Sequence, residues 1–242
     1  MTQNEFAFEC KRLFELNGLP CSELQAEQLY ALTAHMLEVN QYMNLTAIKE
    51  EKAIILRHYV DSLMISEYIE RNNRIIDIGC GAGFPTLPLA IFRPDLSIVA
   101  LDGTAKRIRY VQETAKTLGL NNVLAIAGRA EEYAHQADYR EKFDVVTARA
   151  VAALPVLCEL CLPFARVGGK MIAMKSQQAQ DELAQAKNGI SICGGKTDEV
   201  LQHGLVLENE ESEQRALILI TKIAKTPEKY PRHFSQISKK PL

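Results

Sequence analysis

The sequence predicts an α/β fold with a mostly parallel β-sheet and a helical N-terminal extension. Five short apolar runs alternate with helical segments, and four of the runs are continuously apolar, as in strands whose sheet is covered on both faces. Apolar side chains spaced three and four residues apart over the first 70 residues indicate the extension. A chain of 242 residues can bury the core of one such domain.

The extension is predicted to be helical almost throughout. Ser22, with Gln25 three residues later, forms a plausible capping box for the second helix, and a polar turn at 40–46 follows that helix. The four helices are expected over residues 5–17, 22–40, 49–57 and 61–70.

The remaining chain supplies the sheet. Strands are expected over 75–78, 97–101, 123–126, 143–147 and 170–174, and helices over 85–92, 105–118, 129–135, 153–165 and 178–187. Turns are expected at Pro94-Asp95, Gly119 and Gly168-Gly169. Two last strands, 204–207 and 215–223, are joined across an acidic cluster of Glu208, Glu210, Glu211 and Glu213. We interpret residues 1–242 as one domain with an extension (1–70), a Rossmann-like core (71–225) and an irregular basic tail (226–242).

Composition excludes several classes of protein. A net charge of −2 argues against nonspecific coating of nucleic acid. No apolar run approaches the ~20 residues that cross a bilayer, and the N-terminus lacks the apolar segment of a signal peptide, so we expect a cytoplasmic protein that binds no membrane. The pair Cys158 and Cys161 has the spacing of a metal or redox site, but no second pair accompanies it. Buried core cysteines, and no metal, are therefore the favoured interpretation.

A glycine-rich turn, Gly79-Cys-Gly81-Ala-Gly83, joins the first strand to the next helix. Glycines let the backbone turn tightly and approach a ligand. A dinucleotide fingerprint would have its third glycine at position 84, which is Phe84 here. The spacing therefore favours a cofactor without a phosphate, an amino acid joined to a nucleoside, although such turns also have purely structural versions.

Two further elements support a nucleoside site. Asp102 ends the second strand, 23 residues after Gly79, where a carboxylate would hold a ribose diol. The segment Gly128-Arg129-Ala130-Glu131 follows the third strand, where the adenine would lie. Three such elements on consecutive strand ends favour a nucleoside cofactor over chance packing.

These motifs, with others, resemble those of the bacterial small-subunit rRNA guanine-N7 methyltransferases, the RsmG or GidB family. The matching segments, which run from about residue 44 to residue 242, include Asn44-Leu45-Thr46, His58-x-x-Asp61-Ser62-Leu63, Gly79-x-Gly81-Ala82-Gly83-Phe84-Pro85, Leu101-Asp102 with Lys106-Arg107, Gly128-Arg129-Ala130-Glu131, Thr147-Ala148-Arg149-Ala150, Lys175, and Thr226-Pro-x-Lys229-Tyr-Pro-Arg232. One departure is Thr86, where the family usually has glycine.

The resemblance implies a class I S-adenosylmethionine-dependent methyltransferase with a seven-stranded sheet. It implies methyl transfer from S-adenosyl-L-methionine to N7 of a guanine in 16S rRNA of the 30S subunit, and we expect a monomer. Carried over by motif, the cofactor-binding residues would be Gly79, Gly81, Phe84, Ala130, Glu131 and Arg149. Asp102 joins them through its spacing and the general methyltransferase pattern.

Guanine N7 carries a lone pair at neutral pH, so alignment and electrostatics can supply the catalysis without a base. Arg149, His58 and Asp61 are the catalytic candidates. Arg149 ends an apolar strand, where an arginine needs a partner; it would hold the cofactor or the target nucleotide, or else form a structural ion pair. His58 and Asp61 lie one helical turn apart and would face the substrate, or else only cap or pair. Cys80 is interpreted as a structural loop residue, because N7 attack needs no thiolate.

The basic tail is the best candidate for RNA binding. Residues 221–242 contain six Lys or Arg side chains and one acid, with aromatic residues between them that can stack on bases. Lys175, Lys229 and Arg232 are the predicted RNA-binding residues; the alternative is a solvated tail. Two other functions stay open: a small-molecule methyltransferase, and a nucleoside-binding regulatory module without catalysis.

Overall fold

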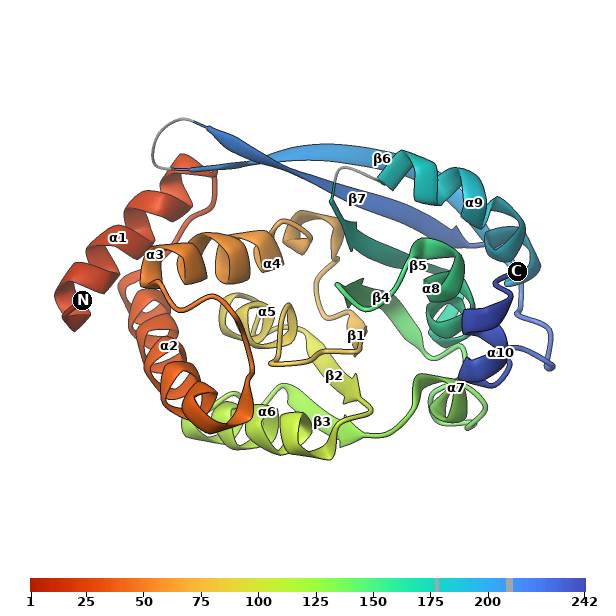
Figure 1. Ribbon diagram of the computed structural model, residues 1–242, viewed down its shortest axis with the longest axis horizontal. Coiled ribbons are helices and arrows are strands. Elements are labelled where there is room, and N and C mark those ends of the chain that lie inside the picture. Colours follow the sequence, from red (N-terminus) through yellow and green to blue (C-terminus); the bar gives the residue numbers. More distant parts are fainter. Residues whose placement is uncertain (177–178, 208–210) are drawn as a thin grey trace.

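A computed structural model describes residues 1–176, 179–207 and 211–242, and shows a seven-stranded sheet between two layers of helices (Figure 1). The strand order is β3-β2-β1-β4-β5-β7-β6. The strands from β1 to β5 pair in parallel, while β7 runs antiparallel to both β5 and β6. Their bounds are β1 Arg74–Ile78, β2 Ser97–Asp102, β3 Val123–Ala127, β4 Phe143–Arg149, β5 Ala165–Lys175, β6 Gly195–Val206 and β7 Ser212–Lys222.

Each face of the sheet has its own core. Successive side chains of a strand point to opposite faces, so Ile75 belongs to the core under the N-terminal helices, whereas Ile76 belongs to the other one. This explains why the parallel strands are continuously apolar. The first face carries α1 (Gln3–Leu16), α2 (Glu23–Met43), α5 (Thr86–Phe92) and α6 (Ala105–Thr117). The second carries α7 (Ala130–Tyr133), α8 (Leu154–Cys161), α9 (Ala179–Ile192) and α10 (Phe234–Lys239).

The two helices expected over 49–57 and 61–70 are instead one helical segment that ends earlier. It consists of α3 (Glu51–Ile54), a π-helical stretch η1 (Ile55–Val60) and α4 (Asp61–Leu63). After it, only a 3₁₀ turn, η2 (Ser66–Tyr68), precedes β1. Within the π stretch the Asp61 amide donates to the Leu56 carbonyl, five residues back. Such widened turns are frequent at functional sites, and no apolar periodicity announces them.

The C-terminal strands also differ from the expectation. β6 begins at Gly195, nine residues before the expected start, because its exposed edge position removes the apolar pattern that marks buried strands. Gly169 lies inside β5 rather than in a turn, and an added Cβ there would meet the Asp144 carbonyl at 2.7 Å. The expected helix start at residue 178 and the expected cluster members Glu208 and Glu210 lie outside the described residues.

The tail is not wholly irregular. It contains α10, whose N-cap His233 accepts a hydrogen bond from the Ser235 amide and whose Ile237 is fully buried. Another short 3₁₀ turn, η3 (Leu162–Phe164), follows α8. Within the described ranges, no helix is both long and apolar enough to span a bilayer.

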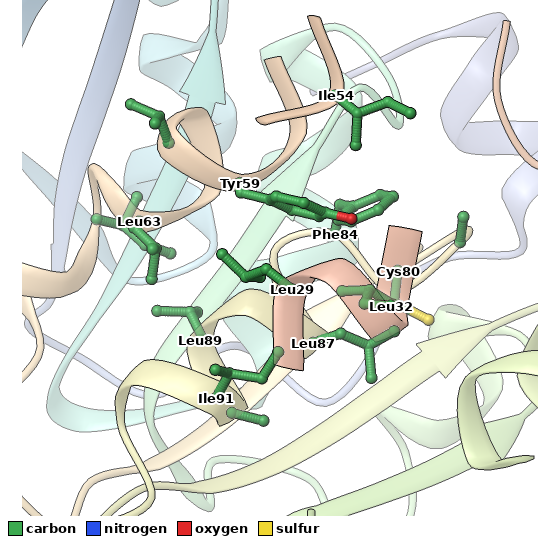
Figure 2. Packing of buried hydrophobic residues seen from close by; sticks show 14 of the residues in the cluster. Leu29, Leu32, Ile54, Tyr59, Leu63, Cys80, Phe84, Leu87, Leu89 and Ile91 are labelled. Carbon is green, nitrogen blue, oxygen red and sulfur yellow. The ribbon is translucent and has the colours of Figure 1, made fainter. Parts of the chain in front are cut away.

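The strand order reverses between β1 and β4, and the crevice beyond their carboxyl ends is where open α/β sheets bind ligands. The loop after β1 carries Phe84, whose buried ring packs beside Tyr59 among aliphatic side chains of the extension, α5 and the glycine loop (Figure 2). The helical extension is thereby joined to the glycine loop through one continuous core.

Candidate functional site

The glycine loop after β1 has a left-handed backbone at its glycines. Gly79 has φ +71° and Gly81 has φ +57°, a region that costs other L-residues free energy. A Cβ at Gly79 would lie 2.6 Å from Val151 Cγ2, so this residue is needed for close packing. A Cβ at Gly81 would meet only the Gly79 carbonyl, at 4.0 Å, and would otherwise enter open space.

Two cavities meet at Gly79, which lines both. The small cavity, of about 300 Å³, lies over the ends of β1, β2 and β3; the large cavity, of about 570 Å³, lies between the glycine loop, η1 and the ends of β4 and β5. Val151, on the loop after β4, lines the small cavity, and its neighbour Ala150 lines the large one.

The small cavity contains the three side chains predicted to hold a nucleoside. Asp102, Ala130 and Glu131 all line it. Asp102 is largely buried, and its carboxylate accepts hydrogen bonds from the Gly81 amide at 3.0 Å and the Thr104 amide at 2.8 Å. Its position relative to the glycine loop is therefore fixed. Arg129, from the predicted segment 128–131, and Phe234, from the tail, complete the wall where the tail meets α7.

The large cavity brings together the three predicted catalytic candidates. Asp61 accepts from Arg149 Nη1 at 2.7 Å on one carboxylate oxygen and from Arg215 Nε at 3.0 Å on the other. Glu213 joins Arg215 to Arg57. The cavity wall carries the cations of Arg57, Arg107, Arg149, Lys175 and Arg215 and the carboxylates of Asp61 and Glu182. Cations therefore outnumber acids, which suits an anionic ligand.

His58 lies flat on Phe84, with ring centroids 4.4 Å apart and an interplanar angle of 8°. Its Nε2 lies 2.8 Å from Thr46 Oγ1, and its Nδ1 lies 3.5 Å from Arg149 Nη2. Because Arg149 has only N–H donors, Nδ1 is the acceptor and Nε2 carries the proton. Burial, together with the charge of Arg149, lowers the pKa of His58 to about 3, so the imidazole is neutral at physiological pH.

Beneath the glycine loop, Asp77 is buried at the end of β1 and accepts a hydrogen bond from Thr86 Oγ1 at 2.7 Å. Burial raises the pKa of Asp77 to about 7, while the hydrogen bond from Thr86 opposes that rise. Cys80 is also buried, and burial raises the pKa of its thiol well above the ordinary value. A thiol that stays protonated is a poor nucleophile, which is consistent with interpreting Cys80 as a structural residue of the loop.

The predicted RNA-binding residues lie apart from one another. Lys175 borders the large cavity, where its amine bonds the Ala152 carbonyl at 2.6 Å and Glu182 at 2.7 Å. Arg232 forms an ion pair with the fully buried Glu159, whereas Lys229 is exposed on the tail. Cys158 and Cys161 are fully buried in the second core. In the described part of the chain no group of three His, Cys, Asp or Glu side chains is arranged for a metal.

Sequence reasoning missed Arg57 and Arg215, and it placed Phe234 among the tail aromatic residues that would stack on RNA bases. Arg215 lies on β7, far along the chain from the glycine motif, and only the pairing of β7 with β5 brings it to the same crevice. The one available signal was an arginine beside an acidic residue at the start of an apolar strand, which is also the pattern of a solvated strand end.

The chain is similar to proteins of one known family. The GidB family model, "rRNA small subunit methyltransferase G", matches residues 25–211. A Ribosomal RNA small subunit methyltransferase G from Brevibacillus brevis is 41% identical over 244 residues, covering 100% of both chains. One from Clostridium novyi is 46% identical over 206 residues, covering 84% of this chain and 83% of its own.

Solved structures support the fold alone, because their sequence identity is low. A SAM-dependent methyltransferase from Methanosarcina mazei has a TM-score of 0.52 at 16% identity, covering 67% of this chain and 98% of its own. The Methanococcus jannaschii protein TYW2, solved in complex with AdoMet, has a TM-score of 0.52 at 16% identity, covering 67% and 77%. The sheet is thus that of class I methyltransferases. With a family match over most of its length and relatives above 40% identity, the chain belongs to the GidB family of rRNA small subunit methyltransferase G proteins.

Proposed function

We propose that this protein transfers a methyl group from S-adenosyl-L-methionine to N7 of a guanine in 16S rRNA of the small ribosomal subunit. The observation that carries the proposal is the pair of cavities that meet at Gly79: the small one contains the carboxylates of Asp102 and Glu131, and the large one has an excess of cations. Family membership supplies the substrate class, since the relatives are named as methyltransferases of small-subunit rRNA.

The residues present fit this cofactor. The open space beside Gly81 leaves room for a ligand to approach the backbone. Asp102 and Glu131 offer carboxylate acceptors for ribose hydroxyls in the small cavity, which has no comparable excess of cations for a pyrophosphate. When bound, S-adenosylmethionine supplies a methyl group on a sulfonium, which a ring nitrogen can attack directly.

The large cavity would then take the methionine part of the cofactor beside Gly81, and the target nucleotide beyond it. N7 carries a free lone pair, so the protein has no proton to remove before attack. The side chains agree with this chemistry: both carboxylate oxygens of Asp61 are bound to arginines, and neutral His58 directs its lone pair at Arg149. We assign Asp61 and His58 as positioning residues for Arg149, which borders the cavity and supplies positive charge to the substrate.

The RNA surface that we propose continues from the large cavity onto α6. Arg107 lines the cavity, while Lys106 and Arg109 are exposed on the first turns of the same helix. Among the described residues these three cations have no ion-pair partner, and the first turn of α6 has no acid. These cations repel one another and lie at the positive end of the helix dipole, which is unfavourable. Bound phosphates would turn this repulsion into attraction. We therefore propose α6 in place of Arg232 as a main phosphate contact.

The test is methyl transfer from labelled S-adenosylmethionine to 30S particles taken from cells that lack the gene. The proposal predicts transfer that requires the RNA particle and that weakens steeply with salt, because phosphate contacts release counterions. Transfer to small molecules without RNA, or transfer indifferent to salt, would favour a small-molecule methyltransferase. Cofactor binding without any transfer would favour a regulatory module.

A further inference from the structure

Phe234, the first residue of α10, lines the small cavity together with Asp102, Ala130 and Glu131. The guanidinium carbon of Arg129 lies 5.0 Å from the centroid of its ring. The other cavity residues all precede residue 161 in the chain, so this aromatic side chain is the contribution of the C-terminal tail. In Figure 1, α10 lies beside α8 and close to α7.

One anchor holds the tail just before Phe234. Arg232 Nη2 lies 2.6 Å from Glu159 Oε2, and the Arg232 amide donates to Glu159 Oε1 at 2.7 Å. Glu159 is fully buried on α8. A buried carboxylate needs its cation, so this pair fixes the chain two residues from the ring.

Further anchors lie on both sides of the ring. Arg140 donates to the carbonyl of Tyr230 at 2.9 Å and to that of Thr226 at 2.8 Å, and the His135 Nε2 donates to the Pro231 carbonyl at 2.9 Å. Beyond the ring, Ile237 is fully buried in the second core. The place of Phe234 at the cavity is therefore set by the fold and not by a loose terminus.

Contacts within the protein also hold two of the basic residues of 221–242. Lys222 is fully buried and donates to the Leu162 carbonyl at 2.8 Å, and Arg232 is held by Glu159. Phe234 and Arg232, which the sequence predicted to be features of an RNA-binding tail, thus make contacts within the protein.

We propose that Phe234 is a cofactor-binding residue, whose ring contacts the adenine of S-adenosylmethionine, and that the tail acts in cofactor affinity rather than in RNA binding. This rests on the proposed function, because it assumes that the small cavity takes the nucleoside. Contact between a purine and an aromatic ring contributes about 1–3 kcal/mol. Replacing the ring by a methyl group should therefore weaken binding by about fivefold to 150-fold.

The experiment measures the Kd of S-adenosylhomocysteine by calorimetry, with the full chain and no RNA. Phe234→Ala should raise the Kd about tenfold, and Phe234→Leu, which keeps the apolar volume that packs against α8, should raise it several-fold at an unchanged Tm. Phe234→Tyr, which retains the ring, should bind nearly as tightly as the wild type. Lys229→Ala is the matched control: it removes an exposed tail cation outside the cavity and should leave the Kd unchanged.

Wild-type Kd values in both Phe234→Ala and Phe234→Leu would overturn the proposal, and a parallel loss of 30S binding would return the tail to an RNA-binding role. An equal loss of affinity in Lys229→Ala would also overturn it, since the effect would then not belong to the ring. If the wild-type chain itself did not bind S-adenosylhomocysteine, the proposed function would fail first, a result distinct from failure at Phe234 alone.

Discussion

The carboxylate of Asp61 holds the guanidinium of Arg149 at 2.7 Å, although 88 residues separate them in the chain. The contact joins α4, which directly follows the π-helical stretch of the extension, to the end of β4. The side chains are only 10% and 15% exposed, so removing the charge of Asp61 leaves two arginines without their shared partner.

We predict that Asp61→Asn lowers the free energy of unfolding by about 3 kcal/mol, as expected when one partner of a buried pair is lost. Methyl transfer should fall by more than tenfold, because Arg149 is no longer fixed. Denaturant titration and initial rates measure the two effects. Glu213→Gln is the control for stability: its ion pairs are more exposed, so it should cost below about 1 kcal/mol. Wild-type stability in Asp61→Asn would contradict this role.

A second prediction distinguishes the loss of space for the cofactor from the strain of a left-handed backbone. Gly81→Ala places a Cβ in the open space of the large cavity and should weaken S-adenosylhomocysteine binding by at least tenfold. Gly119→Ala is its matched control, since Gly119 has φ +68°, and an added Cβ there meets nothing within 4 Å. Both variants carry the same strain, of about 1 kcal/mol, but only the first should change the Kd. Equal affinities would place the cofactor elsewhere. Gly79 is a poorer probe, because an added Cβ there would clash with Val151.

The pKa of His58, lowered to about 3, predicts a pH dependence of stability. Below pH 6.5 the imidazole binds a proton in the unfolded chain but not in the folded one. The contribution of His58 to the free energy of unfolding is therefore complete above pH 6.5 and is lost as pH falls toward 3. Between pH 7.5 and 5.0 the wild type should lose about 2 kcal/mol through this residue, whereas His58→Gln should not. Paired denaturation curves at the two pH values measure the difference. If the difference in unfolding free energy between the two proteins were the same at both pH values, the lowered pKa of His58 would be ruled out.

Asp77 predicts the opposite dependence, because burial raises its pKa to about 7. Between its ordinary value of 3.8 and pH 7 the folded carboxyl keeps a proton that the unfolded one loses, so stability falls as pH rises through this window. Thr86→Val removes the hydrogen bond to the carboxylate and should lower the free energy of unfolding by about 1–3 kcal/mol at pH 8. Thr86→Ser keeps the hydroxyl and should retain most of that stability. Equal losses in both variants at pH 8 would exclude the hydrogen bond as the cause.

Local sequence patterns predicted the parallel part of the sheet, because strands that are buried on both faces of a sheet are continuously apolar and alternate with helices. They also placed Gly79, Asp102 and Glu131 at one crevice, because parallel strands end at the same edge of a sheet. The site residues missed, or given another role, were those brought in by long-range pairing. Arg215 arrives through antiparallel β7, and Phe234 arrives through an ion pair to Glu159 that no periodicity encodes. The π stretch that carries His58 is likewise invisible in apolar spacing.

The most direct test of the proposed activity is the identity of the methylated nucleoside. After transfer of labelled methyl groups to 30S particles from cells that lack the gene, the RNA is digested to nucleosides and separated. Our account predicts that the label is recovered as 7-methylguanosine from a single site in 16S rRNA, and that Arg149→Ala abolishes it. Label on a cytosine carbon, or no transfer to the particle at all, would contradict the account.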